Sequence, residues 1–265
     1  MTSVPEVHLE ADADALATFV ARKTVAALAL ALDARDEAHL VVTGGSILEA
    51  TMAALVPASD GLAVDWSRVH VWWGDERFVA SDSSDRNELP ARAKAFDRLP
   101  LDPAKIHPMP PSDGRYGDDL DAAAAGYAAE LATAALGTDT SDSTVDVPRF
   151  DVVLLGLGPD GHCASLFPDH EPGVQVRDRA VIAVRESPKP PPERLSLTIP
   201  ALDSAEEIWF VASGDGKADA VGRALGGADP VHVPSAGPRG RTRTLWLLDR
   251  DAAVHVPDSV PRADA

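Results

Sequence analysis

A histidine and a carboxylate stand two residues apart in the run GLGPDGH (156–162), directly after a short apolar segment. His162 could act as a general base, because a histidine titrates near neutral pH, and Asp160 could orient it. A histidine hydrogen-bonded to backbone in the interior would give the same sequence, so the pair alone leaves both interpretations open. Cys163 is a poor candidate nucleophile, since it has no evident base beyond its sequence neighbour.

Three other places carry groups that could hold an anion. Gly44, Gly45 and Ser46 end an apolar run and open a helical pattern, so their backbone N–H groups could point outward at a helix N-terminus. An ordinary turn with Ser46 as N-cap fits this segment equally well, because it lacks the lysine of a P-loop. Arg194 follows a proline-rich loop and Lys217 follows a further apolar run, where such side chains can clamp a phosphate.

Charged residues also follow the apolar run 68–73. Asp75 and Arg77 would stand at the carboxyl end of a parallel strand, which is where such sheets bind ligands. A cluster of surface salt bridges would give the same pattern, so these two residues are candidates only in combination with the other segments.

The glycines of the run 156–161 match the pattern G-x-G-x-x-G, so dinucleotide binding has to be considered. Pro159 and Asp160 occupy the turn, where an acidic side chain would oppose a pyrophosphate. Pro168 and Pro172 prevent a full helix after the turn. The run also lies in the middle of the apolar series, and these features together disfavour a dinucleotide site.

A metal site could be assembled from Asp160, His162 and His170, but this ligand set is thin, and Phe167 and Pro168 stand between the two histidines. The single cysteine excludes a cysteine zinc cluster and a disulfide within the chain. No G-x-S-x-G sequence is present, which disfavours a serine hydrolase of that type.

Short apolar runs separated by helical patterns must position these residues. The runs cover residues 39–43, 68–73, 150–155, 180–184, 208–212 and 244–248, and the helical patterns cover 12–34, 47–55, 87–96, 118–136 and 217–225. Near-continuous apolar runs are typical of strands buried on both faces, and their alternation with helices predicts a mostly parallel sheet. We expect a three-layer α/β fold with helices on both faces of the sheet.

We predict a single domain over residues 1–265, because the apolar runs continue across both loops that could have been linkers. These loops are a polar segment at 137–148 and a stiff segment, Ser187–Glu193, that contains four prolines. Residues 257–265 are expected to form a loose tail. The composition, 45% hydrophobic and 25% charged, excludes a wholly disordered chain.

The formal net charge of -18 indicates which partners to expect. A surface this acidic repels nucleic acid, and it repels phosphorylated metabolites unless a local cluster of donors binds them. The N-terminus lacks the features of a signal peptide, and the apolar stretch 15–32 contains Arg22 and Lys23, which favours a soluble helix over a membrane span. We therefore expect a cytoplasmic protein that binds neither nucleic acid nor membrane.

In this order, the motifs resemble those of the 6-phosphogluconolactonases. The matching segments are GGS (44–46), WGDERFV (73–79), LGLGPDGH (155–162), ASLFP (164–168), Arg194 with Ser196, Gly214 with Lys217, and LWLLD (245–249). They extend over about residues 40–253, and the LGLGPDGH segment is highly specific. Ile47 and Leu48 replace the Thr-Pro that usually follows Gly-Gly-Ser in the family. The hydroxyl lost with that threonine must then come from Thr43 or Ser46.

The resemblance implies hydrolysis of 6-phospho-D-glucono-1,5-lactone to 6-phospho-D-gluconate in the oxidative pentose phosphate pathway. It implies no metal, no organic cofactor and no obligatory protein partner. The substrate phosphate would lie on the amides of Gly44, Gly45 and Ser46, with Arg194 and Lys217 closing over it.

The resemblance also implies roles in the reaction. His162 would take a proton from the water that attacks the C1 carbonyl and later return it to the ring oxygen, while Asp160 orients the histidine or the water. Arg77 could stabilise the oxyanion, and Asp75 could bind sugar hydroxyls or fix Arg77.

Two other classes of function stay open. The glucosamine-6-phosphate deaminases share the sheet and the Asp-Gly-His turn, but they carry an Asn-Glu-Pro run where this chain has Leu166, Phe167 and Pro168. The acidic catalytic residue of a deaminase is therefore absent. A non-catalytic sugar-phosphate sensor could share the fold, but the intact Asp160 and His162 argue against it.

Overall fold

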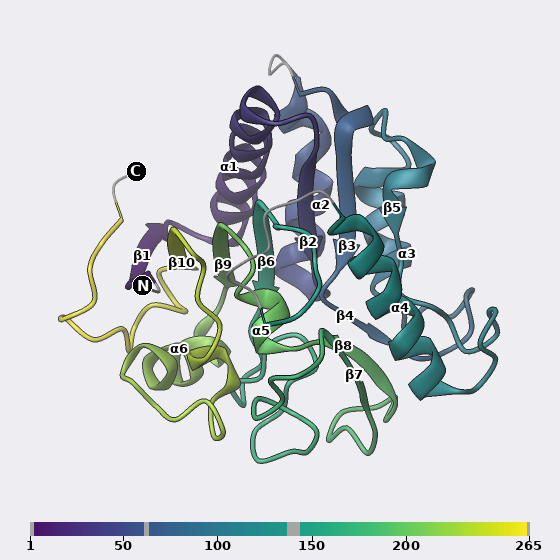
Figure 1. The fold of residues 1–265 in the computed structure, drawn as a ribbon. Helices are drawn as coiled ribbons and strands as arrows, with labels where there is room; N and C mark the ends of the chain where they lie inside the picture. The colour runs from purple at the N-terminus through teal and green to yellow at the C-terminus, as the bar shows by residue number, and fades with distance from the viewer. Residues whose placement is uncertain (1–2, 61–63, 137–143, 264–265) are drawn as a thin grey trace.

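The computed structural model describes residues 3–60, 64–136 and 144–263. Within them, the main sheet has seven parallel strands in the order β1-β10-β9-β6-β2-β3-β5 (Figure 1). These strands are β1 (Pro5–Glu10), β2 (Ala38–Val42), β3 (Val69–Trp73), β5 (Ile106–His107), β6 (Val152–Gly156), β9 (Glu207–Ala212) and β10 (Arg243–Asp249). A smaller antiparallel sheet, in the order β4-β8-β7, consists of β4 (Asp75–Arg77), β7 (Val181–Val184) and β8 (Arg194–Leu197). The prediction of a mostly parallel α/β sheet is confirmed.

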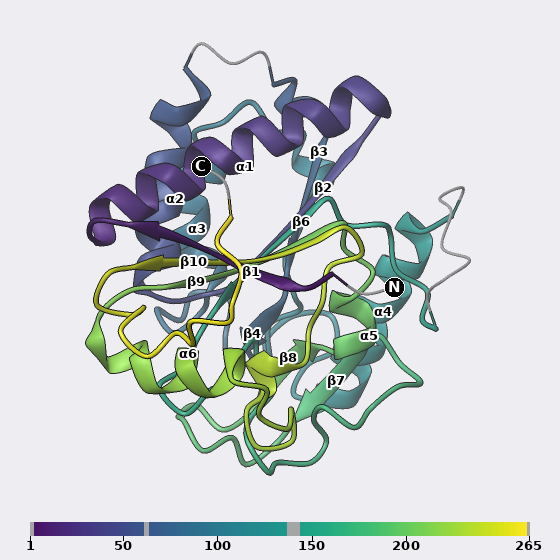
Figure 2. The same ribbon diagram turned by 90° about the vertical axis from the view of Figure 1, so that its left-hand side faces the viewer.

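Helices lie on both sides of the main sheet (Figure 2). They are α1 (Ala13–Ala34), α2 (Ser46–Ser59), α3 (Glu88–Ala91), α4 (Leu120–Ala134), α5 (Ile199–Leu202) and α6 (Ala218–Leu225). α1 and α2 pack against each other on one side, whereas α4 and the small sheet lie on the other. The Tyr127 hydroxyl of α4 accepts from the Trp73 N–H at 3.0 Å and donates to the Trp73 carbonyl at 3.1 Å. α4 is thereby fixed to the end of β3.

Two predicted elements have a different form in the structure. The run 180–184 becomes β7 of the antiparallel sheet, because only the proline loop, too short for a crossover helix, separates it from β8. The helical pattern 87–96 divides into α3 and a π-helical turn at 92–96. The sequence patterns also missed β1 and β5, the two edge strands of the main sheet.

Part of the C-terminal segment predicted as a loose tail, residues 261–263, pairs with β1, and residues 264–265 lie outside the described residues. The Val7 N–H of β1 donates to the carbonyl of Pro261, and the Ala263 N–H donates to the carbonyl of Val7, each at 2.9 Å. β1 is an edge strand whose outer backbone groups would otherwise face water, so the segment covers an open edge. Of the polar loop predicted at 137–148, residues 137–143 lie outside the described residues.

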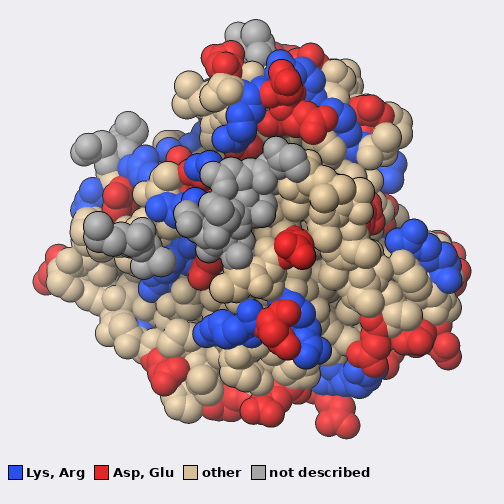
Figure 3. Space-filling view, in the orientation of Figure 1, with Lys and Arg blue, Asp and Glu red and all other residues tan. Residues whose placement is uncertain are grey.

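α1 is, among the described residues, the one helix that is long and apolar enough to cross a membrane. Half of its apolar stretch is buried inside the fold, which is the packing of a core helix. On the face shown in Figure 3, Asp and Glu gather along the lower edge, and Lys and Arg stand in small groups among other residues. The described residues of this face form no continuous basic surface of the kind that binds nucleic acid.

The strand order places one crevice at the centre of the main sheet. β2 and β6 are neighbours, and the chain continues from β2 to β3 on one side and from β6 to β9 on the other. Open α/β sheets bind ligands at such a switch point, outside the carboxyl ends of the strands. The segments after β2, β3, β6 and β9 are those that carry the residues singled out from the sequence.

Candidate active site

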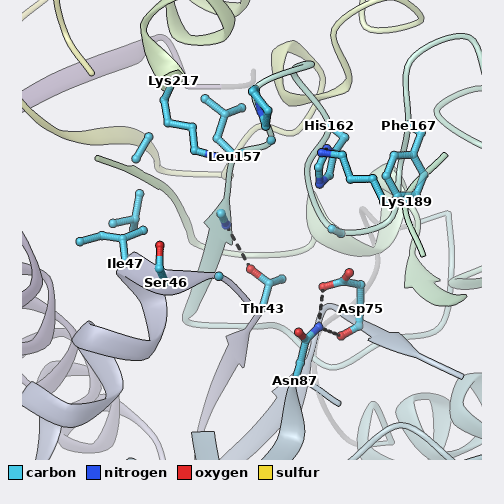
Figure 4. Close-up of a pocket in the computed structure, with 18 of the residues that line it drawn as sticks. Thr43, Ser46, Ile47, Asp75, Asn87, Leu157, His162, Phe167, Lys189 and Lys217 are labelled. Carbon is cyan, nitrogen blue, oxygen red and sulfur yellow. Dashed lines mark hydrogen bonds between the residues drawn. The ribbon is translucent and has the colours of Figure 1, made fainter. Parts of the chain in front are cut away.

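A pocket of about 340 Å³ lies at these carboxyl ends (Figure 4). All residues predicted for the site line it except Asp160; they are Gly44, Gly45, Ser46, Asp75, Arg77, His162, Arg194 and Lys217. Asp160 stands next to the pocket, against the ring of His162. The structure therefore brings together residues that are more than 170 positions apart in the sequence.

The turn after β6 presents His162 to the pocket. The Gly158 N–H donates to the His162 carbonyl at 2.9 Å, and the Gly161 N–H donates to the Gly158 carbonyl at 3.0 Å. Gly161 has a φ of 94°, a conformation that glycine adopts without strain. At Gly158 a Cβ atom would lie 1.9 Å from His162 Nδ1. The glycines of this run thus leave room for the imidazole ring of His162. Residues 157–180 contain no helix of the kind that follows a dinucleotide-binding turn, which argues against a dinucleotide site.

The contact between Asp160 and His162 defines the tautomer of the ring. Asp160 Oδ1 lies 2.6 Å from His162 Nδ1. Burial opposes the charge on Asp160, but the hydrogen bond from His162 and the charges of His162 and Lys189 outweigh it and hold the pKa of this carboxyl well below its ordinary value. An ionised carboxylate only accepts, so Nδ1 carries the proton and donates it. In the neutral ring, Nε2 is then left with a free lone pair.

The opposite end of the pocket can bind an anion. Gly45 has a φ of 121° and turns the chain into α2, whose first N–H groups have no partner within the helix. Lys217, from a 3-10 turn after β9, donates from Nζ to the Leu157 carbonyl at 2.6 Å. Figure 4 shows Ser46 and Lys217 on one side of the pocket and His162 on the other. Burial, followed by the nearby Lys189, lowers the pKa of Lys217 from its usual value.

Thr43 cannot easily replace the hydroxyl that the family's usual threonine would supply. Its Oγ1 donates to the Leu154 carbonyl at 3.1 Å and accepts from the Gly156 N–H at 3.1 Å, so it joins the ends of β2 and β6. Ser46 is exposed to the pocket. Of the two hydroxyls considered from the sequence, Ser46 is the available one.

The small sheet carries three of the predicted residues, Asp75, Arg77 and Arg194. Asp75 pairs with Ser196 and Arg77 pairs with Arg194 across β4 and β8, and Asp75, Arg77 and Arg194 line the pocket. The Glu76 side chain is buried and accepts N–H groups of Arg77, Asn87 and Glu88 at 2.7–2.9 Å. Burial raises the pKa of Glu76 to about 7.

Asn87 joins Asp75 to Arg77. Its amide Nδ2 donates to the Asp75 carbonyl at 3.0 Å, and its Oδ1 accepts from Arg77 Nη1. Asp75 Oδ2 also accepts from the hydroxyl of Ser165 at 2.8 Å. Asp75 and Arg77 are therefore linked through a third side chain, and its place at the start of a helical pattern was the one sequence signal for Asn87.

Arg194 makes contacts other than those expected from the sequence. Its Nε donates to the Pro191 carbonyl at 2.8 Å, and its Nη2 donates to the carbonyls of Lys189 and Pro190 at 3.0 Å each. Burial lowers the pKa of Arg194, although the charge of Asp75 offsets part of this effect. The guanidinium group thus holds the proline loop against β8.

Lys189, on that proline loop, is the residue that sequence reasoning missed. Its Nζ lies 3.1 Å from His162 Nδ1 and 3.3 Å from Asp160 Oδ1. The available signal was its position, since it is the one basic residue among the prolines of Ser187–Glu193.

Of the residues considered as metal ligands from the sequence, Asp160 and His162 are in contact, but His170 does not join them in one cluster among the described residues. The Phe167 ring packs against the rings of both His162 and His170, with centroids 4.8 and 6.2 Å apart. Among the described residues, the potential ligand atoms of Glu37, His39 and His70 lie within 4.8 Å of one another, at the other end of the strands.

That second cluster does not fit a metal ion. The Trp72 indole donates its N–H to His39 Nδ1 at 3.2 Å. Burial lowers the pKa of His39 to about 3, so the ring is neutral and has a single proton. Because Nδ1 accepts, that proton is on Nε2, and neither nitrogen of His39 has a lone pair free to coordinate a metal ion.

Comparisons with known proteins agree with this geometry. The family model described as glucosamine-6-phosphate isomerases/6-phosphogluconolactonase matches residues 11–246. The chain is 47% identical over 268 residues to a 6-phosphogluconolactonase of Streptomyces coelicolor, with 100% of both chains covered. It is 46% identical to that of Mycobacterium tuberculosis, covering 95% of this chain and 98% of the relative. The solved 6-phosphogluconolactonase of Trypanosoma brucei has a TM-score of 0.79 and 26% identity, with 96% and 98% covered.

Proposed function

The chain belongs to the glucosamine-6-phosphate isomerase/6-phosphogluconolactonase family and hydrolyses 6-phospho-D-glucono-1,5-lactone to 6-phospho-D-gluconate, and we propose that His162 activates the attacking water. The observation that carries this mechanism is the 2.6 Å contact between Asp160 and His162 at one end of a pocket whose other end can bind an anion. The substrate has the matching layout, because its phosphate and its C1 carbonyl are at opposite ends.

His162 acts as the general base. Nδ1 donates to the ionised Asp160, so Nε2 is free to take a proton from water as the water attacks C1. The same nitrogen then gives the proton to the ring oxygen when the tetrahedral intermediate opens. The carboxylate of Asp160 favours the imidazolium form in between, which lowers the barrier to the first of the two transfers.

The substrate phosphate binds at the start of α2. The free N–H groups at Gly44–Ser46, the hydroxyl of Ser46 and the ammonium group of Lys217 supply the donors. Arg194 has a supporting role, since three carbonyls of the proline loop occupy its guanidinium group. Because the phosphate is held far from the reacting carbon, the free energy of its binding helps to place C1 beside the attacking water.

Arg77 stabilises the oxyanion that forms at C1. Arg194 is engaged with the loop and Lys217 is at the phosphate end, so Arg77 is the remaining guanidinium that lines the pocket. Asn87 holds it in place, and a preorganised donor of this kind typically contributes about 3 kcal/mol. Asp75, which is buried at the pocket wall, binds a sugar hydroxyl.

The first experiment measures lactone hydrolysis above the spontaneous rate. The lactone is made in place from glucose 6-phosphate by its dehydrogenase, and the product is read through 6-phosphogluconate dehydrogenase. We expect acceleration that a chelator does not reduce, and no ammonia from glucosamine 6-phosphate. Ammonia release would favour the deaminase class, and tight binding of 6-phosphogluconate without turnover would favour a sensor.

Gly158 provides a geometric test of the base. We expect Gly158→Ala to lower kcat by roughly a hundredfold to a thousandfold, within the range that general-base help provides, because the new methyl group would occupy the place of His162 Nδ1. Gly216→Ala is the matched control, since a Cβ there meets nothing within 4 Å. Equal kcat values for the two variants would show that the ring position does not matter.

The cellular setting completes the proposal. The enzyme works in the cytoplasm on a small phosphorylated lactone. The burial of half of the apolar stretch of α1 inside the fold supports a protein that is not held in a membrane.

A further inference from the structure

Lys189 contacts both members of the Asp160–His162 pair, yet the reaction described above does not use it. Its Nζ is 3.3 Å from Asp160 Oδ1 and 3.1 Å from His162 Nδ1, and Figure 4 shows the side chain reaching the edge of the imidazole. Because Nδ1 carries the proton that it donates to Asp160, the ammonium group can donate to the carboxylate but not to the ring. One carboxylate oxygen therefore accepts from two neighbours.

The backbone of the proline loop fixes Lys189 in this place. Its N–H donates to Ser187 Oγ at 3.3 Å, and its carbonyl accepts from the same hydroxyl at 3.0 Å. Arg194 Nη2 donates to that carbonyl as well, at 3.0 Å, and binds the next residue of the loop. The loop is thus tied to β8, and the lysine side chain crosses from it to the turn after β6.

Charged groups approach His162 from several elements. Asp160 is on its own turn, Lys189 comes from the proline loop, and Lys217 comes from the turn after β9. Lys217 lies on the other side of the pocket, and the small sheet contributes three more charged groups at the pocket wall, Asp75, Arg77 and Arg194. A carboxylate alone beside an imidazole favours the charged ring, whereas a cation at about 3 Å opposes it. Lys189 is the cation nearest to the ring among the contacts described.

We propose that Lys189 is a positioning residue for lactone hydrolysis, which holds Asp160 in place and opposes the positive charge on His162. The charge of Lys189 favours the neutral ring, which can accept a proton from water, over the imidazolium. Once protonated, the imidazole gives the proton up to the ring oxygen more readily. A base is most effective when its affinity for protons is matched to the working pH, and a carboxylate alone would bind the proton too firmly. This inference rests on His162 as the general base.

The test is the pH profile of Lys189→Met, which keeps the length of the side chain and removes its charge. We expect the acid limb of kcat/KM to move up by about one pH unit, so that activity falls roughly tenfold at pH 6 and by about twofold or less at pH 8. Lys189→Arg, which keeps the positive charge, should return the acid limb of kcat/KM to its wild-type pH. Lys94→Met is the control, because Lys94 is paired to a carboxylate and is equally exposed, 39% against 38%, but lies outside the pocket.

An NMR titration separates this inference from the mechanism on which it rests. The ring signal of His162, identified by its loss in His162→Gln, should have a midpoint about one pH unit higher in Lys189→Met than in the wild type. If His162→Gln kept its activity, the general-base mechanism would fail while the titration still decided the effect of Lys189. A raised KM with an unmoved limb and an unmoved midpoint would overturn the proposal and make Lys189 a ligand of the substrate.

Discussion

We expect His162→Gln to lower kcat for lactone hydrolysis by about 10²- to 10⁴-fold, while KM stays within about threefold of the wild type. Glutamine keeps a polar side chain of similar length beside Asp160 and Lys189, but it cannot take a proton from water. The lost interaction exists only in the transition state, since the phosphate anchor is at the other end of the pocket. Initial rates must be corrected for spontaneous hydrolysis of the lactone, which sets the lower limit of the assay.

The matched control for this variant is His232→Gln. His232 Nδ1 lies 2.6 Å from Asp169 Oδ1, the same separation as in the active-site pair, but both side chains are exposed and outside the pocket. Its kcat should equal that of the wild type. A His162→Gln enzyme that retained more than about a tenth of the wild-type kcat would remove His162 from the role of base.

The parts of the site that depend on backbone geometry could be predicted from the sequence. Gly45 and Gly161 have positive φ angles, and Gly158 leaves room for the imidazole of His162. Because these positions require glycine, the glycines in the sequence pointed to the turns that form the site. The apolar runs likewise identified the five central strands of the main sheet, because strands buried on both faces are continuously apolar. Edge strands such as β1 mix polar and apolar residues, and the same pattern could not find them.

The parts that depend on contacts between distant segments could not be predicted. Lys189 and Asn87 become functional only because the proline loop and the segment before α3 fold onto the pocket. The resemblance to a family identified Arg194 as part of the site but not what it touches, and its guanidinium group binds loop carbonyls. The type and position of a residue can thus indicate that it belongs to a site. Its role depends on which neighbouring groups accept its hydrogen bonds.

Lys217→Met should have the opposite kinetic signature to His162→Gln. We expect KM for the lactone to rise roughly tenfold to a hundredfold, because a hydrogen bond between charged partners contributes about 1.5–3 kcal/mol and each 1.4 kcal/mol is a factor of ten. The phosphate carries the same charge in the ground state and in the transition state, so its anchor stabilises both, and kcat should change by less than about fivefold. Product inhibition by 6-phosphogluconate should weaken in parallel with the rise in KM.

The control for this variant is Lys23→Met. Lys23 has a pKa lowered mainly by burial, as Lys217 does, but it lies over the ring of Trp209, away from the pocket. Its loss therefore removes a half-buried ammonium group without touching the substrate, and both kinetic constants should match the wild type. The chain as a whole has a charge of -18, so the approach of a phosphorylated substrate depends on a few local cations. If Lys217→Met lowered kcat and left KM unchanged, Lys217 would act on the reacting carbonyl, and the phosphate would have to bind elsewhere in the pocket.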